Sequence, residues 1–350
     1  MTKLKNVWIN GDCMKELPKL QEESVDLIIT SPPYHNLRVY SNDPADISNC
    51  ESYEEYYYLL GNVIEECHRV LKPGGKFVIQ FEDYNYTIGR DGKRGKESIV
   101  GGINQIFLDK GFTLWTEAIW RKYSAQRAML ADGALWYRNL KDKDTQLAAN
   151  WGYVYCYRKD GDTEKATGVD ITLQEWAEWA DAVWNISNSG IGHTTPFAEE
   201  LVKRCIKLWS NPNDTVLDPF AGAGTVNYVA IQNNRNAIGI ELRQDFYDLA
   251  NEKRFDKFTE EDLTSKDSIA QMTERFLQEK ELAEAGKAAK AEEITKKKEQ
   301  TEQKKSLREE IKLLEAQLVA LGMKKSEIKK YKDGITLDTT CNTERQNHIC

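Results

Sequence analysis

Two short segments of the sequence combine residue types that could carry out chemistry. The first is Ser31-Pro-Pro-Tyr34, where an apolar run at residues 27–29 ends in a hydroxyl, two rigid rings and an aromatic side chain. The run is typical of an interior parallel strand, and Pro32 and Pro33 must end it because neither ring nitrogen can donate to a strand ladder. Serine and proline are also ordinary turn residues. The segment alone therefore leaves a catalytic turn and a plain turn as alternatives.

The second segment is TVLDPFAGAGT, residues 215–225, in which an apolar strand runs into Gly222 and Gly224 before a predicted helix. Glycine has no Cβ, so a ligand can approach the backbone closely at such a turn. Glu241 lies about 20 residues further on, at the end of the next predicted strand, where it could accept hydrogen bonds from ribose hydroxyls. This arrangement fits a dinucleotide or S-adenosylmethionine.

The residue types in this turn disfavour a nicotinamide dinucleotide. The turn is not GxGxxG, and Asp218 would place a negative charge against a pyrophosphate. A carboxylate at that place suits a cationic amino-acid group better, because opposite charges attract. Of the two ligands, S-adenosylmethionine is therefore the better match to these residues.

The elements that must position these segments follow a regular alternation. Strand-like runs alternate with amphipathic helical runs up to about residue 255, which is the signature of a parallel sheet covered by helices. Strands are predicted at residues 7–10, 26–30, 76–80, 114–121, 153–157, 215–218 and 237–240, and helices at 53–70, 99–110 and 196–209. Seven strands predict an α/β fold with one doubly wound, mostly parallel sheet.

Composition narrows the class of protein further. The 350 residues are 40% hydrophobic and 30% charged, as in globular proteins. Seven cysteines without a CxxC pair, and no clustered histidines, predict neither a metal site nor a disulfide framework and favour a reducing, cytoplasmic setting. No apolar stretch is long enough for a membrane span. The net charge of -8 disfavours indiscriminate binding of nucleic acid by the whole surface, although a basic loop could still contact phosphates.

Beyond residue 255 the composition shifts to lysine, glutamate, glutamine and alanine, so residues 256–350 are predicted to form a charged helical tail. Apolar residues recur in the tail at spacings of four and three: Leu307, Ile311, Leu314, Leu318 and Leu321. This spacing is typical of a coiled-coil seam and would support a homodimer. A solvated helix with one stripe packed on the rest of the chain is an equal alternative.

Together the two segments resemble the motifs of the amino-group DNA methyltransferases, which modify N4 of cytosine or N6 of adenine. In that family (S/T/N/D)PP(Y/F/W) is the catalytic motif and DPFAGSGT is the cofactor loop; this chain has SPPY at 31–34 and DPFAGAGT at 218–225. The catalytic motif precedes the cofactor loop, which is similar to the circularly permuted beta class. The resemblance covers roughly residues 5–255 and implies a Rossmann-like methyltransferase domain over residues 1–255.

The resemblance also implies a role for each matching residue. Ser31, Pro32, Pro33 and Tyr34 would be catalytic. The residues that would bind S-adenosylmethionine are Asp12, Phe197, Asp218, Phe220, Gly222, Gly224, Thr225 and Glu241. Asp12, in Gly11-Asp12, looks like the family's adenine-contacting motif, and Phe197 would line the pocket for the methionine part. No metal is implied.

The catalytic motif would act on a base that has been flipped out of the DNA stack. The Ser31 hydroxyl oxygen and the Pro32 carbonyl can accept the two hydrogens of an exocyclic amine, and this stabilises the positive charge that develops as the methyl group arrives. Tyr34 would offer a face on which the base can stack. Serine in the first motif position favours N4 of cytosine, and N6 of adenine remains the alternative.

Several residues are predicted to contact double-stranded DNA, each with an ordinary structural alternative. Arg90, Lys93, Arg94 and Lys96 lie in a basic loop that could bind phosphates or form a solvated turn. Arg38 and Tyr40 follow the catalytic turn and could close over DNA or pack within the loop. Trp120 resembles the family position beside the target base, or is a core tryptophan. The irregular segments near 122–150 and 159–192 are candidate target-recognition segments.

Three functional alternatives remain open from the sequence. One is a site-specific DNA methyltransferase, with a cognate restriction endonuclease as a candidate partner. Another is a non-catalytic DNA-binding or scaffolding protein that has kept the fold and uses its tail for interactions. A methyltransferase that acts on RNA or on protein amides is the third, because neither motif excludes those substrates.

Overall fold

The computed structural model describes residues 5–35, 41–86, 88–122, 150–163, 169–187, 197–256, 258 and 269–329, with side chains from residue 295 onward in the last range. Arg38 and Tyr40, most of the predicted segment 122–150, and parts of the segment 159–192 lie outside these residues. The chain divides into two compact units, Met1–Glu279 and Lys280–Cys350.

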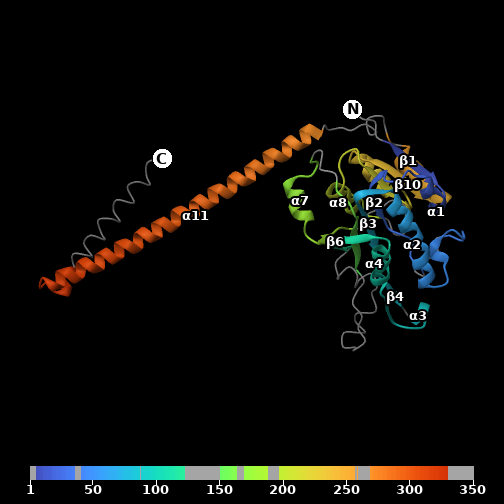
Figure 1. Cartoon of the computed structure of the whole chain (residues 1–350). Coiled ribbons are helices and arrows are strands. Elements are labelled where there is room, and N and C mark those ends of the chain that lie inside the picture. The colour runs from blue at the N-terminus through green and yellow to red at the C-terminus, as the bar shows by residue number, and fades with distance from the viewer. Residues whose placement is uncertain are drawn as a thin grey trace. The chain divides into compact units, whose positions relative to one another are not determined.

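In the described part of the first unit, eight strands form one sheet with the order β1-β10-β9-β2-β3-β7-β6-β8 (Figure 1). The strands are β1 (Asn6–Asn10), β2 (Val25–Thr30), β3 (Leu71–Phe81), β6 (Phe112–Arg121), β7 (Trp151–Lys159), β8 (Val183–Asn185), β9 (Thr215–Asp218) and β10 (Asn236–Glu241). Only β7 among these strands runs against its neighbours, since it pairs antiparallel with β3 and with β6. The α/β class and the mostly parallel sheet are therefore confirmed.

The predicted count of seven strands is wrong by one. The eighth strand, β8, pairs parallel with the end of β6 and lies within the segment that was predicted to be irregular. A second, two-stranded sheet joins β4 (Tyr84–Tyr86) to β5 (Gly95–Glu97), and β5 contains Lys96 of the predicted basic loop. The strands β4, β5 and β8 each have three residues, which is too short for an alternating pattern to be recognised in the sequence.

Helices cover both faces of the sheet, and the three predicted helices are present. The helices are α1 (Cys13–Glu16), α2 (Tyr53–Val70), α3 (Ile88–Asp91), α4 (Ile99–Asp109), α7 (Leu173–Trp179), α8 (Glu199–Trp209), α9 (Thr225–Gln232) and α10 (Gln244–Ala250), with short helical turns η1 (Leu17–Lys19), η2 (Ile47–Asn49) and η3 (Asn251–Phe255). Helix α8 begins at Glu199, with Ala198 as its N-cap, three residues after the predicted start at 196. Residue 196 itself lies outside the described residues.

The sheet separates two hydrophobic cores. On one face α2 and α4 bury side chains such as Leu60 and Ile103 against Ile28 of β2. On the other face α8 and α9 bury Leu201 and other apolar residues against the opposite side of the same strands (Figure 1). Burial on both faces explains why residues 27–29 of β2 are all apolar. The packing of helices on both faces also fixes the positions of the strand ends.

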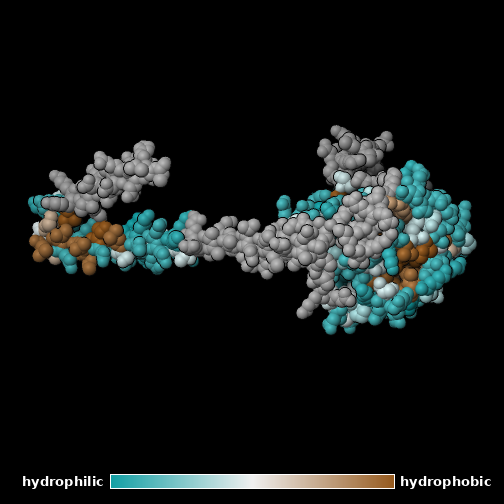
Figure 2. All heavy atoms as spheres, turned by 90° about the horizontal axis from the view of Figure 1, so that it is seen from above, coloured by the Kyte–Doolittle hydropathy of each residue, from teal (hydrophilic) through white to brown (hydrophobic). Residues whose placement is uncertain are grey.

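In the described part of the tail one long helix, α11 (Ile269–Ala320), is present, in agreement with the predicted helical character of these residues. Within residues 295–320, where the side chains are described, the apolar side chains lie toward the C-terminal end of the helix and appear brown in Figure 2. Leu307, Leu314, Leu318 and Leu321 of the predicted seam are exposed, and Ile311 is half-buried. Across the part of the chain that the structure describes, no helix is long and apolar enough to cross a membrane.

Candidate active site

A single pocket collects residues from the carboxyl ends of β1, β2, β3, β9 and β10. These strands come from distant parts of the sequence, and the sheet order reverses direction between β9 and β2. Such a switch point leaves a crevice outside the strand ends, which is where ligands bind in open α/β sheets. The pocket is lined by most of the sequence-predicted site: Asp12, Ser31, Pro32, Pro33, Tyr34, Trp120, Phe197, Asp218, Phe220, Gly222, Thr225 and Glu241.

A buried hydrogen bond ties the two sequence motifs together. The Thr30 hydroxyl, at the end of β2 and next to Ser31, donates to Asp218 Oδ1 at 2.7 Å. The same carboxylate oxygen accepts from the Phe220 N–H at 3.0 Å. This hydrogen bond shapes the start of the turn that contains Gly222 and Gly224, called the glycine turn below. Burial raises the pKa of Asp218 to about 7, because the low-dielectric interior disfavours the charged form.

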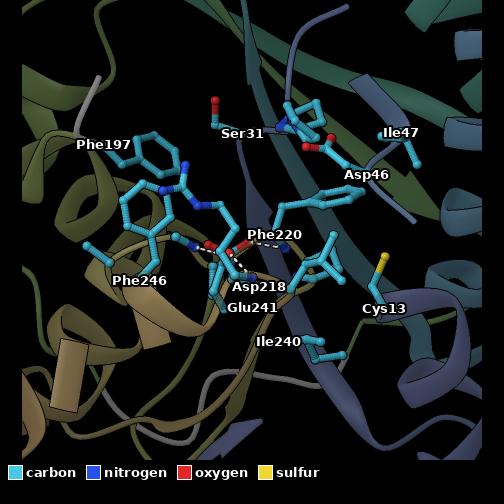
Figure 3. A pocket seen from close by; sticks show the side chains of 18 of the residues that line it. Cys13, Ser31, Asp46, Ile47, Phe197, Asp218, Phe220, Ile240, Glu241 and Phe246 are labelled. Atoms are coloured by element: carbon cyan, nitrogen blue, oxygen red, sulfur yellow. Dashed lines mark hydrogen bonds between the residues drawn. The ribbon is translucent and has the colours of Figure 1, made fainter. Parts of the chain in front are cut away.

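Glu241 also holds the turn that contains Gly222, and it lies beside Asp218 in Figure 3. One carboxylate oxygen accepts from the Gly222 N–H at 2.7 Å, and the other accepts from the Arg243 N–H at 2.8 Å. Burial also raises the pKa of Glu241 to about 7, and the neighbouring Asp218 charge acts in the same direction. The pocket therefore contains two carboxyl groups that a bound cation would favour in their ionised form.

The two glycines of the turn have different structural roles. Gly222 has φ +53°, and a Cβ at this position would meet no atom within 4 Å, so this backbone borders open space in the pocket. Gly224 has φ +71° and is the N-cap of α9; a Cβ there would lie 2.6 Å from the Phe255 ring. Gly224 does not line the pocket, and it is required for packing and for the backbone conformation.

Apolar side chains form the walls of the pocket. In Figure 3, Phe197 and Phe246 lie on one side, while Ile47 and Cys13 lie on the other. Asp12 enters at the end of β1 and caps α1, since its Oδ1 accepts from the Met14 N–H at 2.9 Å. Flat apolar walls with a few carboxylates suit a ligand that combines an aromatic ring with cationic and hydroxyl groups.

At the catalytic motif, the hydroxyls of Ser31 and Tyr34 converge on one acceptor. Both donate to Gln80 Oε1, at 3.0 Å and 3.3 Å, and the two hydroxyl oxygens are 3.4 Å apart. Pro32 and Tyr34 are buried, whereas Ser31 is half-buried and borders the pocket. The turn is thus fixed in place and presents its serine to the cavity.

Sequence reasoning missed the polar residues that come from β3 and β6. Gln80, Glu82 and Lys122 all line the pocket, and Lys122 forms an ion pair with Glu82. The sequence did offer a signal, because each of them stands where a strand with buried residues ends. Asp46, Ile47, Arg243 and Phe246 were also missed, since they come from segments without a motif.

Trp120 is a buried tryptophan that also borders the pocket. Its side chain is buried, and its Nε1–H donates to the Ile186 carbonyl at 2.8 Å, as expected for a core tryptophan. It also lines the pocket, on the side of Lys122, whose ammonium lies 5.3 Å from the ring centroid.

The four cations of the basic loop do not line the pocket. Arg90 lies 4.5 Å from the centroid of the Tyr84 ring, and Lys93 lies 3.7 Å from that of Tyr86, so both pack on β4. Lys96 is 3.8 Å from the Asp83 carboxylate. All four cations remain exposed, which keeps them accessible to a polyanion.

These features place the chain in the class of doubly wound α/β proteins that bind a ligand at the switch point of the sheet. The DNA methylase family of N6- and N4-methyltransferases matches residues 25–252, and the chain belongs to this family.

Individual relatives agree with this assignment. The chain is 28% identical over 265 residues to the type II beta methyltransferase M.BslI of Bacillus sp. strain NEB-606, and the match covers 70% of this chain and 27% of that protein. It is 26% identical over 303 residues to the type II methyltransferase M.BglI of Bacillus subtilis, with coverage of 71% and 85%. Among solved structures, TTHA0409 of Thermus thermophilus, in complex with S-adenosyl-L-methionine, is 26% identical with a TM-score of 0.58, and the match covers 72% of this chain and 93% of that one.

Proposed function

We propose that this protein is a site-specific DNA methyltransferase that transfers a methyl group from S-adenosylmethionine to N4 of a flipped cytosine. The observation that carries the proposal is the 2.7 Å hydrogen bond from Thr30 to Asp218, which joins the catalytic turn to the glycine turn within one pocket. Methyl donor and acceptor can therefore meet at fixed positions, and orientation of this kind is a major source of rate in a direct displacement.

The proposed cofactor site uses the pocket residues around the glycine turn. Glu241 accepts hydrogen bonds from ribose hydroxyls, and Asp218 offsets the positive charge of the methionine part. Asp12 contacts the adenosine, Phe197 and Phe220 supply apolar surface, and Gly222 gives the ligand access to the backbone. Thr225 borders the same cavity. Gly224 supports this site through the conformation of the turn.

The proposed chemistry is a direct displacement. The lone pair of the exocyclic amine forms a new C–N bond while the C–S bond of the sulfonium breaks and leaves a neutral thioether. Ser31 and the Pro32 carbonyl accept the two amine hydrogens, which directs the lone pair toward the methyl group. Pro33 keeps the carbonyl rigid, and Tyr34 and Trp120 border the base. The proton lost from the methylated amine passes to solvent.

We propose a role for each larger part of the chain. The methyltransferase domain comprises residues 1–255, the segments near 122–150 and 159–192 read the DNA sequence, and Arg38 and Tyr40 contact DNA beside the catalytic turn. Residues 256–350 form a tail with a seam for a homodimer. A cognate restriction endonuclease is a further proposed partner, and cytoplasm is the proposed location.

Mass spectrometry of nucleosides tests the proposed function. The protein is incubated with labelled S-adenosylmethionine and, separately, with duplex DNA, RNA and a protein mixture, and the products are digested. We expect label in DNA alone, as N4-methylcytosine. N6-methyladenine would replace the cytosine assignment and keep the reaction class. Label in RNA or protein only, or no transfer with cofactor bound, would contradict the proposed substrate.

The basic loop is proposed to hold DNA phosphates without reading sequence. Replacing Arg90, Lys93, Arg94 and Lys96 by glutamine is expected to weaken binding similarly for cognate and random duplexes. The slope of log K against log salt concentration should fall by about 0.9 for each phosphate that the variant no longer neutralises, because fewer counterions are released. Fluorescence anisotropy at several salt concentrations measures this slope.

A matched control for that variant replaces four exposed tail lysines, Lys296, Lys297, Lys298 and Lys304, with the same change in net charge. We expect the salt slope of this control to stay near that of the wild type. Equal slopes in the loop variant and the wild type would mean that the loop is an ordinary solvated turn.

A further inference from the structure

Gln80 is a buried amide at the wall of the proposed active site. It lies near the end of β3, with 4% of its surface exposed, and lines the pocket beside Ser31. Gly152 on β7 makes room for it, since a Cβ at that glycine would lie 2.9 Å from Gln80 Nε2. The amide is thus enclosed by the sheet and has few alternative orientations.

The environment of this amide fixes which of its ends faces the serine. Gln80 Nε2 lies 3.4 Å from Glu82 Oε1, and Glu82 is in turn ion-paired with Lys122. An ionised carboxylate can only accept hydrogen bonds, so the amide NH₂ must face Glu82 and the amide oxygen must face the hydroxyls. Ser31 Oγ donates to that oxygen at 3.0 Å and Tyr34 Oη at 3.3 Å.

A serine hydroxyl has one hydrogen and two lone pairs, and its hydrogen rotates to suit its surroundings. Once the Ser31 hydrogen is committed to Gln80, only lone pairs remain for the pocket, so the hydroxyl can accept from an amine and cannot donate to it. A hydroxyl that donated to the amine nitrogen would occupy the lone pair that must attack the methyl group. We propose that Gln80 is a positioning residue that holds the Ser31 hydroxyl as an obligatory acceptor toward the target amine. This inference rests on the proposed function.

A double-mutant cycle between Gln80 and Ser31 tests the inference. Gln80→Met keeps a long unbranched side chain and removes the amide acceptor; single-turnover methylation of duplex DNA is then measured with saturating cofactor. We expect Gln80→Met to slow transfer about 10- to 100-fold when Ser31 is present. In the Ser31→Ala background the same change should cost less than about threefold, because coupled residues are not additive. Calorimetric affinity for S-adenosylmethionine should be unchanged.

A conservative variant distinguishes a positioning role from a structural one. Gln80→Glu retains an oxygen that can accept from both hydroxyls, and combining it with Glu82→Gln keeps one amide and one carboxylate in the pair; this double variant should stay within about tenfold of the wild type. Gln80→Leu repeats the measurement if the methionine variant does not show a wild-type melting transition. Equal losses in the Ser31 and Ser31→Ala backgrounds, or an unimpaired Gln80→Met, would overturn the positioning role.

The design separates this failure from failure of the proposed function. If the wild type transfers no methyl group to DNA, the proposed function is wrong. If Ser31→Ala is fully active, the proposed mechanism is wrong. In both cases the inference about Gln80 is wrong as well. If Ser31→Ala is impaired and Gln80→Met is not coupled to it, only the inference is wrong. The rate loss caused by Gln80→Met could also depend on Tyr34 and not on Ser31. If that loss disappears in the Tyr34→Phe background and persists in the Ser31→Ala background, the positioning role toward Ser31 is wrong.

Discussion

Replacing Ser31 with alanine is expected to lower the single-turnover rate of DNA methylation by about 100- to 1,000-fold. The hydrogen bond that this change removes strengthens as positive charge develops on the amine, so its removal raises the barrier far more than it weakens the ground state. Cofactor affinity should be unchanged, because Ser31 contacts the acceptor side of the pocket. Quenched-flow measurement with saturating cofactor and DNA gives the rate, and calorimetry gives the affinity.

Ser98→Ala is a suitable control for this experiment, since Ser98 is exposed and makes no capping hydrogen bond with its side chain. It should behave as the wild type does. A Ser31→Ala variant that loses cofactor affinity and rate in equal measure would mean that Ser31 supports the cofactor site and has no role in the displacement.

The second large effect concerns the charge of Asp218 and its dependence on pH. Its pKa is raised to about 7, so the carboxyl is mostly protonated below pH 7 and ionised above it. A cationic cofactor binds the ionised form, so the Asp218 carboxyl should make affinity rise with pH, level off above about pH 8, and be about tenfold weaker at pH 6 than on the plateau. Glu241, with a pKa of about 7, adds to the slope in the same direction.

Asp218→Asn isolates the contribution of this carboxyl. The amide oxygen can still accept from Thr30 and Phe220, so the turn should keep its shape. Loss of the charge is expected to weaken S-adenosylmethionine binding at pH 7.5 by about 1.5–3 kcal/mol, or roughly 10- to 150-fold, and to flatten the pH dependence. Calorimetry from pH 5.5 to 8.5 measures both the affinity and its pH dependence. An Asp218→Asn variant with wild-type affinity and slope would place the cofactor's cationic end elsewhere.

The sequence indicated the chemistry of the site mainly through two short segments whose residues are neighbours along the chain, whereas Asp12 and Phe197 followed only from the family resemblance. Asp218 and Gly222 share one turn, and Ser31 and Tyr34 share another, so their spacing alone indicates the chemistry. The fold was predictable for the same reason, since strands buried on both faces give apolar runs that end at recognisable turns. Strands of three residues such as β8 carry no such signal, and the eighth strand was therefore missed.

The sequence places Gln80 near the end of a buried strand, but its proposed role depends on strand pairing, which the sequence does not show. Thr30 of β2 lies opposite Ile79 of β3 in the parallel register, which brings the next residues, Ser31 and Gln80, side by side. A shift of one residue in this register would turn the amide to the other face of the sheet. The ion pair between Lys122 and Glu82 also depends on strand pairing. Glu82 follows β3 and Lys122 follows β6, and β7 lies between these two strands in the sheet.

The pairing of β6 with β7 has an evolutionary consequence. Arg121 lies opposite Trp151, so the chain leaves the sheet and returns to it at adjacent points. The free energy of closing such a segment rises by only about 0.6 kcal/mol for each doubling of its length. A lineage can thus lengthen, shorten or replace residues 122–150 while the sheet and the catalytic turn stay intact. If that segment reads DNA, exchange of one contiguous piece of gene supplies an existing methyl-transfer centre with a new target sequence.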